Sequence, residues 1–170
     1  MRFRNRREGE YIVDTSALTR NQEVDACRAA IRVIRPHVDR FQCDVPWDNN
    51  GSWPGEVVAS PTVLAPLPED ATPKQTYRNT GWVLNFETET WDAFVTFAPY
   101  SLSADAWTAD MKFVLSASDE GTSLAVSVSP DLLRDFKRSV VGADLVPVDD
   151  WSRRRREEWR LRINRRNADG

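Results

Sequence analysis

The chain offers few residues whose types suit catalysis. His37 is its only histidine, and Cys27 and Cys43 are its only cysteines. A thiolate activated by an imidazole is a nucleophile, and His37 and Cys43 both fall near the end of an expected helix, so they form one candidate pair for a small cysteine and histidine hydrolase. A buried thiol and a surface imidazole are the simpler interpretation, which we favour.

The same residues do not match a metal site. Cys27, His37 and Cys43 lack zinc-finger spacing, and a single histidine leaves little material for a histidine-based centre. The glycine-rich loops that cradle phosphates and the Gly-x-Ser-x-Gly nucleophile motif are also missing from the sequence. We therefore expect no metal and no cofactor, assign no catalytic residue, and lean away from an enzyme.

Two tryptophans stand in one proline-rich loop at residues 44–55. Trp47 and Trp53 flank the sequence DNNG at 48–51, which is a strong turn signal. The two indoles either form a platform that binds a partner or anchor the loop to the core. We favour the anchor, since large apolar loop residues usually find a surface to bury against, and keep both residues as candidate partner contacts.

Charge is segregated along the chain. The net charge is -3, yet residues 1–7 carry +4, residues 151–170 carry +5, and the acidic body between them carries -12. A basic terminus suits either a partner protein or the phosphate backbone of a nucleic acid. The candidate nucleic-acid contacts are Arg2, Arg4, Arg6, Arg7, Arg153, Arg156 and Arg160.

The C-terminal arginines are expected on a helix that begins at Asp149 or Asp150. Three interpretations of it remain open: a helix lying on its own acidic body, a helix whose tryptophans anchor a partner protein, and a helix that binds phosphates. The candidate partner-binding stripe follows i, i+4 steps along one side and consists of Trp151, Arg155, Trp159 and Ile163.

Alternating apolar residues predict the sheet that must position these features. Four strands are expected at 82–86, 91–97, 111–117 and 124–128, with a weaker edge strand at 56–65. The period of two directs one set of side chains, which includes Trp82, Leu84 and Phe113, toward covering helices. The N-terminal residues form either a loose basic arm or, from Tyr11 onward, another edge strand.

Two helices are expected to cover that face. Thr19 and Gln22 make a capping box that starts a helix over 19–41, which Pro36 should kink or break. Ser129 and Pro130 begin a second helix over 130–141. The predicted fold is α+β: an antiparallel four- or five-stranded meander with two core helices on one face and a basic C-terminal helix. We divide the chain into a basic N-terminal arm (1–10), a single α+β domain (11–148) and an Arg-rich C-terminal helix (149–170).

Composition favours a binding function. No apolar run approaches the ~20 residues of a membrane span, and no apolar segment of a signal peptide follows the basic N-terminus, so we expect a soluble, cytoplasmic protein with no membrane contact. We expect a non-catalytic protein-binding module or assembly subunit, inhibitor-like, immunity-like or structural, whose partner is another protein or its own oligomer. The alternatives are a nucleic-acid-associated or virion structural protein, and the hydrolase.

Overall fold

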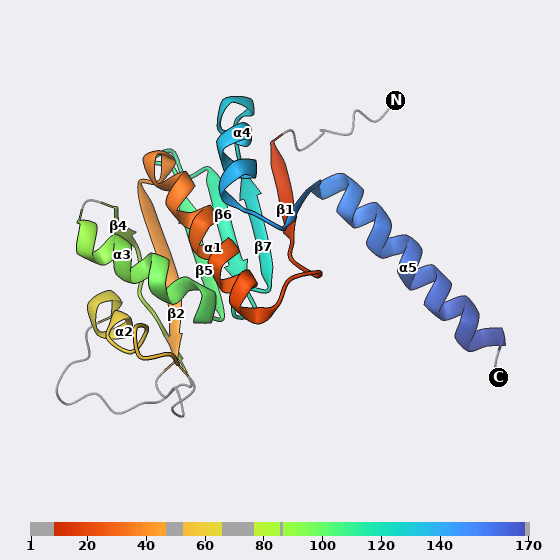
Figure 1. Cartoon of the computed structure of the whole chain (residues 1–170), viewed down its shortest axis with the longest axis horizontal. Coiled ribbons are helices and arrows are strands. Elements are labelled where there is room, and N and C mark those ends of the chain that lie inside the picture. The colour runs from red at the N-terminus through yellow and green to blue at the C-terminus, as the bar shows by residue number, and fades with distance from the viewer. Residues whose placement is uncertain (1–8, 47–52, 66–76, 86, 169–170) are drawn as a thin grey trace.

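The computed structural model describes residues 9–46, 53–65, 77–85 and 87–168, with 161–168 as backbone alone. These residues form an α+β fold around one antiparallel sheet (Figure 1). Its strands are β1 (Glu10–Asp14), β2 (Arg40–Pro46), β3 (Tyr77–Asn79), β4 (Val83–Leu84), β5 (Ser103–Trp107), β6 (Phe113–Ser118), β7 (Ser123–Ser127) and β8 (Asp144–Pro147). The order across the sheet is β3-β2-β5-β6-β7-β1-β8, with β4 also pairing with β2.

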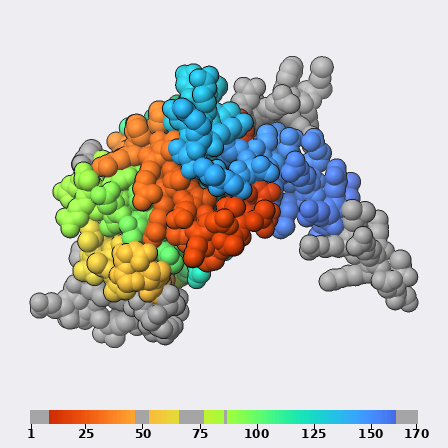
Figure 2. All heavy atoms as spheres, viewed as in Figure 1, coloured from red at the N-terminus to blue at the C-terminus, as the bar shows by residue number. Residues whose placement is uncertain are grey.

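Helices cover one face of this sheet. Figure 2 shows that side covered by the side chains of α1 (orange), α3 (green) and α4 (cyan), while α5 (blue) leads away from the body. The helices are α1 (Arg20–Ile34), α2 (Ser60–Leu64), α3 (Thr88–Phe97), α4 (Pro130–Ser139) and α5 (Val148–Ala168), with 3-10 turns η1 (Arg35–His37) and η2 (Ala98–Tyr100).

The first helix begins as predicted and ends earlier. The capping box is present, with the Thr19 backbone N–H donating to Gln22 Oε1 at 2.9 Å. Pro36 has no backbone N–H and cannot form the next hydrogen bond of the helix. Helix α1 therefore ends at Ile34, and the 3-10 turn η1 follows. The prediction of a helix to residue 41 is wrong beyond this turn, because Phe41 belongs to β2.

Residues 91–97 are helical, and the predicted strand there is wrong. Trp91, Val95 and Phe97 fit a period of two, but Phe94 and Ala98 are equally buried and fit only the i, i+3, i+4 and i+7 spacing of a helix. The ring of Phe94 stacks on Phe41 with centroids 4.2 Å apart, which fixes α3 against the sheet.

Other strand predictions are confirmed in part. The strands at 111–117 and 124–128 are β6 and β7, joined by the expected hairpin at Gly121, whose φ is 77°. The strand at 82–86 shrinks to β4, and residue 86 lies outside the described residues. The edge strand at 56–65 is wrong, because Pro61 starts the short helix α2. Sequence periodicity missed β2, β3, β5 and β8. The N-terminal residues from Tyr11 onward form the predicted strand as part of β1, although it lies between β7 and β8 and not at the edge of the sheet.

Candidate functional site

The face of the sheet turned away from the helices is the candidate site. Cross-strand partners in an antiparallel sheet point to the same side, and the buried residues Val13, Leu115 and Phe41 identify the helix-covered side. The alternate residues make up what we call the open face. It comprises Glu10, Ile12, Asp14, Arg40, Gln42, Asp44, Ser103, Asp105, Trp107, Phe113, Ser116, Ser118, Ser123, Ala125, Ser127, Asp144 and Val146.

The middle of the open face is lined by small side chains. Strands β6 and β7 contribute Ser116, Ser118, Ser123, Ala125 and Ser127. Small residues leave the backbone close to the surface, so a partner element can approach the sheet there. The floor therefore lies lower than the larger side chains at both ends of the face.

A pocket of about 420 Å³ lies at the β1 end of the face. Ile12 and Ala125 are cross-strand partners on its floor, and Val148, the first residue of α5, borders it. Most of its lining is apolar, with Glu10 contributing a carboxylate. The full lining is Glu10, Ile12, Phe113, Ala125, Val126 and Val148.

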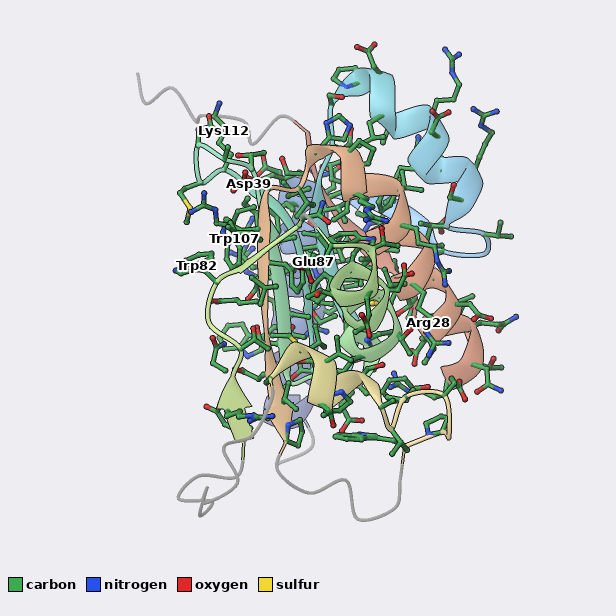
Figure 3. All side chains as sticks on the ribbon, turned by 90° about the vertical axis from the view of Figure 1, so that its left-hand side faces the viewer. Arg28, Asp39, Trp82, Glu87, Trp107 and Lys112 are labelled. Atoms are coloured by element: carbon green, nitrogen blue, oxygen red, sulfur yellow. The ribbon has the colours of Figure 1, made fainter. Side chains whose placement is uncertain are left out.

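Aromatic residues occupy the opposite end. Trp82 and Trp107 contact edge to face, with centroids 4.8 Å apart and ring planes at 69°. Figure 3 shows both on the side of the sheet opposite to Arg28 and the helices. Trp82 is 53% exposed, and Leu84, which pairs with Arg40 of β2, is 44% exposed. Met111, 47% exposed, lies in the turn between β5 and β6.

The prediction that Trp82, Leu84 and Phe113 face the covering helices is wrong. Between β5 and β6 the register shifts, so that Trp107 pairs with Phe113 while Ala106 pairs with Leu115. The extra residue, Val114, is a β-bulge, and it turns Phe113 to the open face although Leu115 faces the core. Leu84 pairs with Arg40, which places the end of β4 on the open face as well.

The open face is also acidic. Its described strand residues include one base, Arg40, whose guanidinium lies 2.7 Å from the Asp39 carboxylate. The acids are Glu10, Asp14, Asp44, Asp105 and Asp144. Several carboxylates around an apolar patch with exposed aromatic groups suit a basic and amphipathic partner.

The C-terminal helix presents its basic residues to solvent. Residues 153–160 are exposed, Trp151 is half-buried, and Trp159 is 65% exposed. Arg153 forms an ion pair with Asp150 at 3.0 Å. The interpretation that α5 lies on its own acidic body is therefore wrong for 153–160, which include Arg155, Arg156 and Arg160. Ile163 lies where side chains are not described.

Of the two loop tryptophans, Trp53 lies among the described residues. Trp53 is half-buried and contacts Phe97 edge to face, with centroids 5.2 Å apart, which is the geometry of an anchor. Trp47 lies outside the described residues, as do the N-terminal Arg2, Arg4, Arg6 and Arg7. Of these residues the structure places Trp53, which lies against α3 and not on the open face.

Arginines of α1 pack against aromatic rings on the helix-covered side. The guanidinium groups of Arg20 and Arg28 lie over the ring of Tyr100, 5.5 and 6.0 Å from its centroid. Arg28 also donates to the Thr96 carbonyl at 3.2 Å, and Arg35 lies over Trp91. These contacts stabilise the packing of α1 on η2 and α3.

The burial of the Cys43 thiol argues against the candidate hydrolase pair of Cys43 and His37. Cys43 is buried, and burial, together with the neighbouring Asp44 carboxylate, raises its pKa far above the ordinary range. His37 is exposed in η1. A thiol held protonated in the core is a poor nucleophile. Within the described part of the chain, no group of three or more histidine, cysteine, aspartate or glutamate side chains is arranged to hold a metal ion.

Comparison with known proteins gives no relative. The chain matches no protein-family model, and no curated protein or solved structure is significantly similar to it. Among the helices of the described residues, none combines the length and apolar character needed to cross a membrane.

Proposed function

We propose that this chain is a non-catalytic protein-binding module whose acidic body and basic C-terminal helix both engage protein partners. The observation that carries the proposal is the open face, where exposed tryptophan, leucine and methionine lie among carboxylates. Helices cover the opposite face, so the binding surface is a rigid sheet.

The exposed aromatic side chains support a binding function, because burying them against a partner supplies binding energy. Trp82 leaves half of its surface in water, whereas Trp91 is buried in the core. Apolar patches with polar rims mark interaction surfaces, and tryptophan is enriched among the residues that dominate interface energy. Trp82, Leu84 and Met111 are therefore the expected anchors.

Carboxylates support the choice of a basic partner. The body carries -12 over residues 8–150, and the open face contributes acids from four strands. Such a field accelerates association with a positively charged surface and loses this effect as salt rises. An inhibitor that covers the basic site of another protein fits this description.

Affinity capture with matched variants tests the proposal. The purified chain is immobilised, exposed to extract of its source cells, and washed at about 50 mM and about 500 mM salt. A specific partner is expected to be retained at low salt and released at high salt, and the double variant Trp82→Ala, Leu84→Ala should lose it. Val141→Ala is the control, since Val141 is exposed at the end of α4, away from the open face.

Two results would overturn the proposal. One is the absence of any retained protein at every salt concentration. The other is a retained protein that the open-face variant and the removal of residues 153–170 both leave bound. Reconstitution with the purified partner then separates contacts of the open face from contacts of α5.

The exposed arginines favour nucleic acid as a second candidate. Arg153, Arg154, Arg155, Arg156 and Arg160 all stand free of the body on one helix, and each neutralised phosphate adds salt-dependent affinity. Fluorescence anisotropy with labelled double-stranded DNA and single-stranded RNA tests it. Binding that disappears after removal of residues 153–170 supports this candidate, and the absence of binding by the intact chain removes it.

A further inference from the structure

We propose that helix α5 of one copy of the chain docks on the open face of a second copy, so that two copies exchange their C-terminal helices. The inference rests on the proposed binding function and names the partner as the chain itself. It follows from three properties of the described residues: the direction of α5, the opposite charges of the two surfaces, and the apolar groups on each.

The direction of α5 carries its far half away from the open face of its own chain, although its first residue, Val148, borders the pocket there. The helix starts at Val148, directly after β8, and continues without interruption to Ala168, so it extends about 30 Å at 1.5 Å per residue. Figure 1 shows it leaving the body beside β1. A straight helix cannot fold back, so a surface that binds its far half must come from another molecule.

Charge makes the two surfaces complementary. The open face bears Asp14, Asp105 and Asp144, and α5 bears exposed arginines from 153 to 160. Placing each helix on the acidic sheet of the other copy brings opposite charges together.

Apolar groups match as well. Trp159 exposes 65% of its surface, which makes it the most exposed tryptophan among the described residues. The pocket at the β1 end is of about 420 Å³ and has Ile12, Phe113 and Ala125 in its lining. An indole of Trp159 from the second copy fits an apolar pocket of this kind, and Asp14, on the same strand as Ile12, supplies a carboxylate for the arginines.

Exchange of the same element in both directions produces a closed dimer. Each copy has one donor helix and one acceptor face, so a two-fold arrangement satisfies both surfaces at once and leaves no open end. The acidic body and the basic helix are then two halves of one interface, which explains why the charges are segregated along the chain.

A charge-swap experiment tests the inference on the full chain. The face variant carries Asp105→Arg and Asp144→Arg, and the helix variant carries Arg153→Glu, Arg156→Glu and Arg160→Glu. Sedimentation velocity at about 50 mM salt measures the mass of each, and of an equimolar mixture. Circular dichroism and urea unfolding confirm that each variant is folded, and Lys137→Glu on exposed α4 is the charge control.

The expected result is a wild-type dimer that dissociates as salt rises, two variants that are monomers alone, and a mixture that restores the dimer. In the mixture, the two arginines introduced on the face of one variant meet the glutamates introduced on the helix of the other, and the remaining pair keeps its wild-type charges. Trp159→Ala should weaken the wild-type dimer at least about tenfold, while Val141→Ala should not.

Other results overturn the inference. One is a wild-type chain that stays monomeric at all protein and salt concentrations. Another is a pair of charge variants in which each dimerises alone as the wild type does, or a mixture of the folded variants that stays monomeric. The last is association that nuclease treatment abolishes. A monomer that still captures a different protein through the open face removes the inference and leaves the proposed function standing. A monomer that captures nothing removes both.

Discussion

At the scale of single residues, the loop between β6 and β7 depends on Gly121. Asp119, Glu120 and Gly121 all have positive φ, and a Cβ added to Gly121 would lie 3.0 Å from the Pro99 Cα. Gly121→Ala should therefore lower the free energy of unfolding by about 1 to 3 kcal/mol, through backbone strain and the clash. Urea unfolding measures it. Gly55→Ala is the control, because nothing lies within 4 Å of a Cβ there; equal losses for both variants would contradict the prediction.

The two buried thiols make stability fall at high pH. Burial raises the pKa of Cys27 from 9.0 to about 12. Between these values the unfolded chain loses the thiol proton and the folded chain keeps it, so the free energy of unfolding decreases as pH rises, by about 1.4 kcal/mol per pH unit. Cys27→Ala should reduce the slope of unfolding free energy against pH by that amount between pH 9 and about 11. An unchanged slope would show that the Cys27 pKa is not raised in the folded state.

At the scale of elements, α3 shows why periodicity alone misassigned a segment. Its sequence satisfies a strand pattern through Trp91, Val95 and Phe97 and a helix pattern through Phe94 and Ala98. Only packing against Phe41 in β2 decides between them, and that contact joins residues about fifty positions apart. The helix caps, the β6–β7 hairpin and α5 were predictable, because their signals are local. The bulge that turns Phe113 outward depends on pairing with β5, which no local signal reports.

The packing of α3 gives a test at this scale. Phe94 is fully buried between Phe41 and Trp91, so Phe94→Ala should remove about 3 to 5 kcal/mol of stability through lost contacts and a cavity. Val58→Ala, at a residue 52% exposed, should change stability by less than about 0.5 kcal/mol. Chemical denaturation followed by circular dichroism measures both. A Phe94→Ala variant as stable as the control would mean that α3 does not pack on the sheet as described.

At the scale of the whole molecule, the chemical character of the candidate site could be predicted from the sequence, but its location on the fold could not. The charge segregation and the exposed Trp159 on a basic helix follow from the sequence. The open face does not, because its residues come from strands β1, β2, β5, β6, β7 and β8, and three of these lie in segments that periodicity missed. Residues such as Asp105 and Ile12 come to lie in one row across the sheet only through the register of its strands.

The separation of the body from α5 leads to a last prediction. The hydrophobic core lies within residues 13–140, and the main contacts of α5 with the described body are those with β1 and β8. Removing residues 153–170 should leave the unfolding free energy within about 1 kcal/mol of the full chain, because no core contact is lost. The same truncation should abolish salt-sensitive association, since it removes every arginine of α5. Urea unfolding measures the first effect and sedimentation the second. A truncated chain that is several kcal/mol less stable would place α5 on its own body, and one that associates as before would place the binding surface elsewhere.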